Sequence, residues 1–368
     1  MKRKIMYSIL IIIALLALTT VWVLSFPIFG RVPEGARLER IKKLPNYKDG
    51  GLENLSPTPM KPDDVSYWDM IKGMLKGNDK GAPKNALPTV KPDFTQNDTE
   101  TKITWFGHSS YLVQTDGQNI LVDPVLSERP SPISFIGSKR FLGTDFVKAE
   151  DFPELDVVLI THDHYDHLDY EAILKLKDKT KRFIVSLGVG SHLEHWGVPA
   201  SKITELSWGE ETVQSSLKFT ALPARHFTGR VFKRNQTVWS AFVLQTSKDK
   251  LYLGGDSGYD THFKTAGEQY GPFDIAILEC GQYNAYWPLI HMFPEQTVQA
   301  ALDLKAKVLL PVHWGKFKLA MHDWNEPIIR VVKKADEEGL KITTPLMGES
   351  VILNATYPSG RWWLADNL

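Results

Sequence analysis

The sequence predicts an α/β (α+β) fold, with β-sheets flanked by helices, preceded by an apolar N-terminal helix and a proline-rich segment. Three observations support this prediction. The chain opens with an apolar run, residues 31–100 are punctuated by prolines, and from residue 101 short apolar strands come first in runs and later alternate with helical stretches. That order is typical of sheets covered by helices. We therefore divide the chain into residues 1–30, 31–100 and 101–368.

Composition excludes several classes of protein. Hydrophobic residues make up 43% and charged residues 23% of the 368 residues, as in globular proteins. Lys plus Arg equals Asp plus Glu at 43 each, and no basic stripe is interleaved with aromatics, so we expect no nucleic-acid partner. Cys280 is the single cysteine, which excludes an intrachain disulfide.

The first segment reads as a membrane anchor. Residues 5–28 contain no charged residue and are long enough to span a bilayer as a helix. A cleaved signal peptide is the alternative, with Val23 and Ser25 as a small-residue pattern at a plausible cleavage site. We favour an uncleaved anchor because the run is long for a signal sequence. Lys2, Arg3 and Lys4 favour an exported body on the periplasmic or extracellular side, although basic residues also follow the run.

Within residues 31–100, "DDVSYWDMIKGMLKG" predicts a short helix capped by Asp63 or Asp64. Its apolar residues fall at helical spacing. We favour packing of this helix on the body, and its closeness to the anchor leaves a membrane-lying helix open as an alternative. The apolar positions are Val65, Trp68, Ile71, Met74 and Leu75.

From residue 101 the elements follow in order. Three consecutive strands are predicted at "KITWFGH", "SYLVQTD" and "NILVDP", with a hairpin signal at Asp116-Gly117. Later strands are "DVVLIT", "RFIVSLG", "KFTALPARH", "SAFVLQT", "KLYLGGD", "FDIAILEC" and "AKVLLPVHW". Helices are predicted at "YEAILKLKD", "PEQTVQAALDLK" and "NEPIIRVVKKADEEG".

Side chains that commonly bind metals crowd into "ITHDHYDHLD", directly after the strand "DVVLIT". His162 and His164 alternate by two and can converge from one side of an extended turn, and Asp166 and His167 can point at a neighbouring position. Imidazole and carboxylate ligands suit zinc and its neighbours. Four such residues in one loop predict two adjacent metal ions, because one tetrahedral ion rarely takes all four ligands from six residues.

Three further residues of the same kind each follow an apolar strand, namely His226, Asp256 and His313. Any one of them alone is more often structural, but their shared placement predicts a common metal centre. Asp123, also at a strand end, is predicted to support a metal-binding histidine rather than to bind metal itself. The same holds for His108, whereas His192, His195, His262 and His322 are predicted to be surface or loop residues.

With "THDHYDH" followed by His226, Asp256 and His313 in this order, the chain resembles the metallo-β-lactamase superfamily, whose fold is an αββα sandwich. Within it, the chain is most similar to the N-acylphosphatidylethanolamine-hydrolysing phospholipase D group, through "TWFGHSSYLVQ", "DPVLSERPSPISFIGSKRF", "GPFDIAILECG" and "VHWGKFKLA". The resemblance covers roughly residues 100–350. The HxHxDH motif identifies only the superfamily, and the stretches around Arg140, His291 and His313 are more specific.

The resemblance implies two zinc ions per chain, although iron or manganese could replace them. One ion would be held by His162, His164 and His226, and the other by Asp166, His167 and His313, with Asp256 bridging both. Asp166, Asp256 and His291 are the implied catalytic residues. The predicted substrate contacts are His291, Arg140 and, in an apolar loop, Phe135.

The leading hypothesis is a membrane-anchored, zinc-dependent phosphodiesterase of phospholipase D type. It would hydrolyse an (N-acyl) glycerophospholipid to phosphatidic acid and free headgroup, with a water shared by the metals as nucleophile. A net positive site with apolar loops beside a membrane tether suits an anionic, lipid-like substrate. A lactone or ester hydrolase on the same site is one alternative, and a non-catalytic metal-binding or assembly protein is another.

Overall fold

The computed structural model describes residues 2–95, 100–133, 135–230, 233–365 and 368, and its core is two stacked β-sheets. One sheet has seven strands in the order β15-β3-β4-β5-β6-β7-β8, and the other has six in the order β14-β13-β12-β11-β10-β9. The strands of the seven-stranded sheet are β3 (Lys102–Trp105), β4 (Tyr111–Thr115), β5 (Gln118–Val122), β6 (Leu155–Ile160), β7 (Thr180–Ser186), β8 (Ile203–Leu206) and β15 (Ser350–Ile352). Those of the six-stranded sheet are β9 (Glu211–Gln214), β10 (Leu217–Pro223), β11 (Ser240–Gln245), β12 (Lys250–Leu253), β13 (Ile275–Glu279) and β14 (Leu309–Val312).

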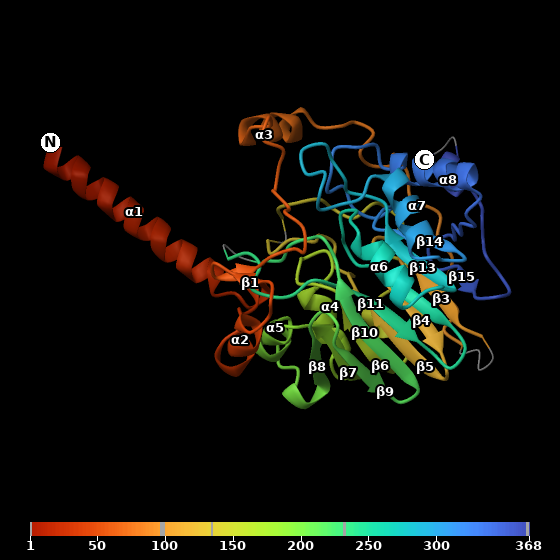
Figure 1. Cartoon of the computed structure of the whole chain (residues 1–368). Coiled ribbons are helices and arrows are strands. Elements are labelled where there is room, and N and C mark those ends of the chain that lie inside the picture. Colours follow the sequence, from red (N-terminus) through yellow and green to blue (C-terminus); the bar gives the residue numbers. More distant parts are fainter. Residues whose placement is uncertain (1, 96–99, 134, 231–232, 366–367) are drawn as a thin grey trace.

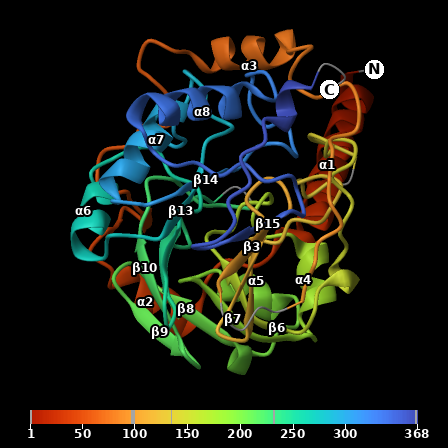
Figure 2. The ribbon, with the colours of Figure 1, turned by 90° about the vertical axis from the view of Figure 1, so that its right-hand side faces the viewer.

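Helices cover the outer face of each sheet (Figures 1 and 2), so the architecture is the expected αββα sandwich. The seven-stranded sheet is covered by α4 (Tyr170–Leu176) and α5 (Gly190–His195). The six-stranded sheet is covered by α6 (His262–Gln269), α7 (Pro294–Asp303) and α8 (Glu326–Glu338).

Strand β6 shows why this sheet needs cover on both faces. Its last four residues, 157–160, are apolar without a break, and alternate side chains point to opposite faces. Val157 and Leu159 pack between the two sheets, whereas Val158 and Ile160 pack under α4 and α5. A strand buried on both faces is typical of parallel pairing, and β6 pairs in parallel with both β5 and β7.

Strand direction brings the loops with the predicted ligands to one edge of the sandwich. Strands β5, β6, β7 and β8 run parallel in one sheet, and β12, β13 and β14 run parallel in the other. The antiparallel pairs β10–β11 and β11–β12 turn β10 into the same direction as β12. The polar residues that follow these strands therefore meet at the carboxyl ends.

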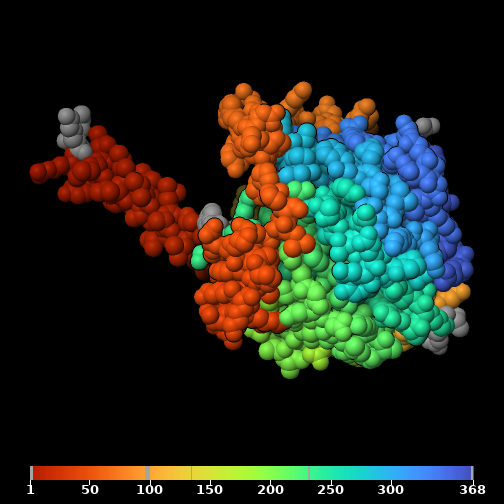
Figure 3. All heavy atoms as spheres, in the orientation of Figure 1, coloured from red at the N-terminus to blue at the C-terminus, as the bar shows by residue number. Residues whose placement is uncertain are grey.

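The N-terminal part lies outside the sandwich. Helix α1 (Lys2–Leu24) projects away from the body and is long and apolar enough to cross a membrane, by length and composition (Figure 3). After a short turn at Pro27–Phe29 come α2 (Gly35–Lys42), a two-stranded sheet of β1 (Tyr47–Lys48) and β2 (Gly51–Leu52), and α3 (Tyr67–Lys76).

Some elements differ from the sequence predictions. Helices α2, α5 and α6 and the short strands β1, β2, β8, β9 and β15 were not predicted. The predicted helix α3 forms, but its cap is Ser66, whose hydroxyl accepts from Asp69 N at 3.1 Å, rather than Asp63 or Asp64. Its apolar face does not pack on the body either, because none of its residues is buried.

Candidate metal centre

The seven predicted ligands come together at the carboxyl edge of the two sheets. His162, His164, Asp166 and His167 lie in the loop between β6 and α4. His226 follows β10, Asp256 follows β12 and His313 follows β14. Two groups of candidate ligand atoms contain all seven, and within each group the atoms lie within 4.8 Å of one another. The first group is His162, His164, His226 and Asp256, and the second is His108, Asp166, His167 and His313. A third group of the same kind shares Asp256 and His313 with these two and adds Glu279 and His291.

In the first group, ring nitrogens of three histidines converge. His164 Nδ1 lies 3.0 Å from His162 Nε2 and 3.2 Å from His226 Nε2. Asp256 Oδ2 is 3.8 Å from His162 Nε2 and 3.7 Å from His226 Nε2. Zinc–nitrogen bonds of about 2.0–2.1 Å in tetrahedral geometry separate two ligand nitrogens by roughly 3.4 Å. The observed spacings surround that value, so this group fits one metal ion.

Asp256 also belongs to the neighbourhood of the second group. Its Oδ2 lies 3.1 Å from His167 Nε2, and its Oδ1 lies 3.1 Å from His313 Nδ1. One carboxylate therefore faces both groups, which is the position that a bridging ligand requires. Burial raises the pKa of Asp256 to about 6, the direction expected for a carboxyl group removed from water without a bound cation.

Several buried atoms here have no hydrogen-bond partner among the described residues. They include His164 Nε2, His167 Nε2, Asp256 Oδ1 and His313 Nε2. Buried polar atoms are normally paired, so a cluster of unpaired ones indicates a missing ligand. The protonation states agree, because burial lowers the pKa of His162, His226 and His313 well below the usual value and keeps them neutral, as metal ligands must be.

His167 shows that the second group stabilises positive charge. Burial lowers its pKa, but the carboxylates of Asp256, Asp166 and Asp123 raise it more, so that the net shift is well above the usual value. Surroundings that stabilise a charged imidazole would also stabilise a divalent cation. The donor set of this group therefore also fits a metal ion.

Neighbouring residues fix the orientation of the candidate ligands. Asp123 Oδ2 lies 2.8 Å from His167 Nδ1 and accepts from Thr161 Oγ1 at 2.6 Å, which confirms the contact expected of Asp123. His108 Nε2 lies 3.0 Å from Asp166 Oδ2. Supporting contacts of this kind set the tautomer and direction of a metal-binding histidine.

The backbone is strained at three of these positions. His108, Asp123 and His313 have φ values of 52°, 41° and 67°, which non-glycine residues rarely adopt. The strain is held by paired main-chain bonds, because His313 N donates to His108 O at 2.9 Å and His108 N donates to Trp314 O at 3.0 Å. Such strain clusters at functional sites.

His291 lies at the more open side of the centre. Its side chain is 12% exposed, and its ring centroid is 5.0 Å from that of His226 and 5.3 Å from that of His313. His291 Nδ1 lies 2.7 Å from Glu279 Oε2, which leaves Nε2 as the free nitrogen. Gly258 allows this loop to come close, since a Cβ there would overlap the carbonyl of Leu289.

Glu279 was not singled out from the sequence. It is the last residue of β13, its side chain is completely buried, and its Oε1 accepts from Ser257 N at 2.7 Å. Burial raises its pKa well above the usual value and lowers that of His291, so both shifts favour an uncharged pair. The available signal was a charged residue at the end of the apolar run "IAIL" of "FDIAILEC".

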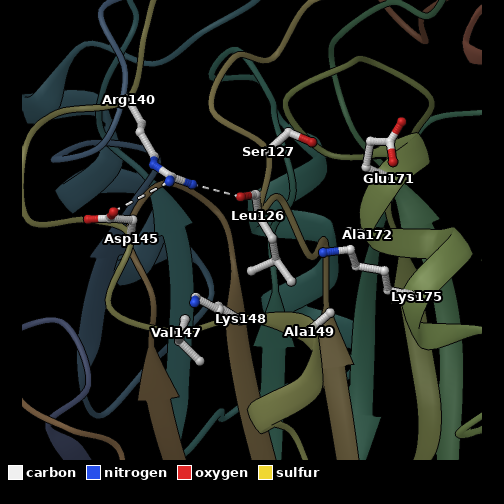
Figure 4. Close-up of a pocket in the computed structure, with 10 residues that line it drawn as sticks. All are labelled: Leu126, Ser127, Arg140, Asp145, Val147, Lys148, Ala149, Glu171, Ala172 and Lys175. Carbon is white, nitrogen blue, oxygen red and sulfur yellow. Dashed lines mark hydrogen bonds and ion pairs between the residues drawn. The ribbon is translucent and has the colours of Figure 1, made fainter.

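Arg140 and Phe135 are not brought into either group of candidate ligands. Arg140 lines a separate pocket with Leu126, Asp145 and Lys175, where its Nη1 donates to Leu126 O at 2.9 Å and its Nη2 lies 3.5 Å from Asp145 (Figure 4). Phe135 is 79% exposed. Their contact with substrate remains a prediction.

The segment before the sandwich reaches the centre from outside. Asn54 Nδ2 donates to His226 O at 2.8 Å, and Asn54 Oδ1 accepts from His226 N at 3.0 Å. Near the HxHxDH loop, Arg31 N donates to His192 Nδ1 at 2.9 Å, and His192 Nε2 lies 3.3 Å from Asp163 Oδ2. The prediction of a surface or loop position was therefore wrong for His192, which is buried in α5. His262 is also buried, at the start of α6.

The chain is similar to known proteins in sequence and in fold. A family model described as a beta-lactamase superfamily domain matches residues 118–314. An uncharacterized protein of Mycobacterium tuberculosis is 39% identical over 328 residues, covering 88% of each chain. The N-acyl-phosphatidylethanolamine-hydrolyzing phospholipase D 1 of Caenorhabditis elegans is 32% identical over 284 residues, covering 73% of this chain and 80% of that protein.

Two further similarities bear on location and fold. The outer membrane protein RomA of Klebsiella pneumoniae is 55% identical over 95 residues, which are 26% of this chain and 72% of that protein. A metallo hydrolase of the archaeon Ignicoccus hospitalis shares the fold, with a TM-score of 0.54 at 23% identity, and the match covers 70% of this chain and 100% of that one.

Proposed function

This chain belongs to the metallo-β-lactamase superfamily and is a metal-dependent hydrolase, and we propose that it is a phosphodiesterase of phospholipase D type that acts on a membrane glycerophospholipid. The products would be phosphatidic acid and the free headgroup. The similarity to the phospholipase D of Caenorhabditis elegans supports the substrate class. The observation that favours it most in the site itself is the Glu279–His291 pair beside the ligand groups.

Two divalent ions, for which zinc is the proposed identity, would activate a water and neutralise charge on the phosphate. His162, His164 and His226 would hold one ion, and Asp166, His167 and His313 the other, with Asp256 between them. Asp123 orients His167. His291 Nε2 is placed to donate a proton to the leaving headgroup oxygen, and the uncharged Glu279 carboxyl group would at the same time pass its own proton to His291 Nδ1.

Location follows the same reasoning. Helix α1 would anchor the chain in a membrane with the body on the exported side. The RomA similarity supports membrane association, since that relative is named an outer membrane protein. A membrane phospholipid would then be within reach of the tethered body.

The experiment is to incubate the full chain, reconstituted in vesicles, with a panel of glycerophospholipids and to identify products by mass spectrometry, with bound metal measured on the same samples. We expect phosphatidic acid with free headgroup. His291→Ala should lower the rate by about 100- to 10,000-fold, the usual loss for a general acid, and leave metal content unchanged.

Two results would contradict the proposal. Efficient opening of a lactone or ester without phosphodiester cleavage would show that the chain is a lactone or ester hydrolase. Loss of metal in His291→Ala in proportion to the lost rate would place His291 among the ligands instead.

A further inference from the structure

Helix α3 exposes an apolar face that the body leaves uncovered. Five of its six large apolar residues are exposed, and these five fall on one side of the helix at 100° per residue. A protein rarely leaves such a contiguous surface in water without a partner. In Figure 3 the helix stands out above the rest of the molecule. The face consists of Tyr67 (66% exposed), Trp68 (60%), Ile71 (45%), Met74 (55%) and Leu75 (78%).

The helix is nevertheless fixed in place. At its start, Ser66 and Asp69 form a capping box. Its other side rests on the body at Gly73, where a Cβ would lie 2.9 Å from the Tyr286 ring and 3.1 Å from Met321 Sδ. Beyond its end, Asn78 Nδ2 donates to Met321 O at 3.0 Å. The orientation of the exposed face is therefore set by the body.

The anchor determines what this face meets. Only Ser25 and Phe26 separate α1 from the turn that docks on the body, where Trp196 Nε1 donates to Pro27 O at 2.6 Å and Arg230 Nη2 donates to Ile28 O at 2.9 Å. A body joined so closely to a membrane span lies at the membrane surface. In Figure 1, α3 lies on the upper left of the body, the side from which α1 projects.

We propose that the apolar face of α3 inserts into the lipid surface and places the loop that carries His291 at the level of the phospholipid headgroups. The inference rests on the proposed membrane anchoring and lipid substrate. Tyr286, against which α3 packs, belongs to the loop between β13 and α7 that contains His291. The contact of α3 with Tyr286 thus links the helix that would insert into lipid to the loop that carries the proposed proton donor.

The side chains of α3 favour lipid over a protein partner. Tyrosine and tryptophan prefer the membrane interface, and lysines beside them can reach lipid phosphates. Lys72 Nζ lies 5.6 Å from the Trp68 ring centroid, and Lys61 Nζ lies 5.6 Å from that of Tyr67. The apolar side chains of α3 would meet the lipid acyl chains, and the ammonium groups beside them would meet the lipid phosphates.

The first test measures depth directly. Cys280 is completely buried, so Leu75→Cys supplies a single reactive thiol for an environment-sensitive fluorophore. The full chain is reconstituted in phosphatidylcholine–phosphatidylglycerol vesicles that contain nitroxide-labelled lipid. We expect a blue shift and loss of emission at position 75. The matched control is Val213→Cys, an apolar position on β9 at the far end of the body that is 64% exposed, and neither change is expected there.

The second test measures lipid use. Trp68→Ser with Leu75→Ser should lower the rate on long-chain phospholipid in vesicles, relative to a short-chain phospholipid dispersed in water, by about tenfold, the factor for losing about 1.4 kcal/mol of apolar burial. Val213→Ser should leave this ratio unchanged. An unchanged ratio in the α3 variant would overturn the inference.

The outcomes separate this inference from the proposed function. If the label at position 75 stays in water while vesicle phospholipid is cleaved, the role of α3 is wrong and the function stands. If the label inserts and no phosphodiester is cleaved, the proposed function is wrong and the role of α3 in membrane binding stands. A blue shift without quenching by lipid nitroxide would mean that a protein surface, such as a second copy, covers α3, and would overturn the inference.

Discussion

Asp123 accepts hydrogen bonds from Thr161, and its carboxylate lies 2.8 Å from His167 Nδ1. Asp123→Asn should weaken metal affinity by about 10- to 100-fold, since an amide orients and polarises the imidazole less well. Competition with a chelator measures this affinity. Asp274→Asn is the matched control, because Asp274 bonds Lys250 N and Lys307 Nζ away from the centre. Equal losses in both variants would contradict the role of Asp123.

Glu279 gives a second residue-scale prediction. Glu279→Gln keeps the shape of the buried side chain but removes the acidic partner of His291 Nδ1. We expect kcat to fall by about 10- to 100-fold with KM and metal content little changed, because glutamine can still hold His291 but has no carboxyl proton to pass to Nδ1 when Nε2 gives up its own. Metal analysis beside steady-state kinetics checks this. A parallel loss of metal would instead identify Glu279 as a ligand.

Lys316 gives a pH dependence of stability. Its ammonium group donates to Phe106 O at 3.1 Å and Val125 O at 2.8 Å, and burial lowers its pKa to about 7. Between about pH 7 and pH 10 the unfolded chain therefore binds the extra proton, so this group makes the free energy of unfolding rise with pH, by at most about 1.4 kcal/mol per pH unit. Lys316→Met should remove that slope. Unfolding of both chains at pH 7, 8, 9 and 10 measures the difference, and parallel curves would contradict it.

At the scale of elements, strands buried on both faces were predictable because their apolar runs have no other stable placement. Strands β5, β6, β13 and β14 belong to this class. Strands β9 and β15 were missed because they are short edge strands whose pairing, rather than their composition, makes them strands. The same limit applies to the exposure of α3, which depends on the surface of the body, whereas its cap of Ser66 and Asp69 is a local contact within the sequence.

The candidate site divides in the same way. Ligand-type residues at strand ends were visible because His and Asp stand out after apolar runs. Glu279 and Asn54 could not be assigned, since each acts through a contact with a residue distant in sequence, namely His291 and His226. Such contacts cannot be inferred from sequence spacing before the fold is known.

Helix α1 carries the element-scale prediction. The mature protein should retain residues 1–28, because the span is long for a signal peptide and its end is followed at once by docked residues. N-terminal sequencing or intact mass of protein extracted from membranes measures this. A mature chain that begins after Ser25 would replace the anchor with a cleaved signal.

For the molecule as a whole, we expect close to two divalent ions per chain. An ion that binds only the folded state stabilises it, so a chelator should lower the midpoint of thermal unfolding by about 5–15 °C, and added zinc should restore it. Asp256→Ala, which lacks the carboxylate facing both groups, should show a smaller shift and hold one ion or fewer. An identical midpoint with and without chelator would contradict a structural contribution from metal.

The pairing of β15 with β3 has a consequence for how this protein is made. Ser350 lies opposite Thr104, so the seven-stranded sheet is completed by a strand that leaves the ribosome almost last. Asn54, near the start of the chain, likewise cannot bond to His226 until residue 226 has been synthesised. The span emerges first and can be inserted while everything after it is still unfolded. With α1 as the proposed anchor, assembly of the sandwich, and with it binding of the proposed metal ions, would be a late event that follows insertion of α1 into the membrane.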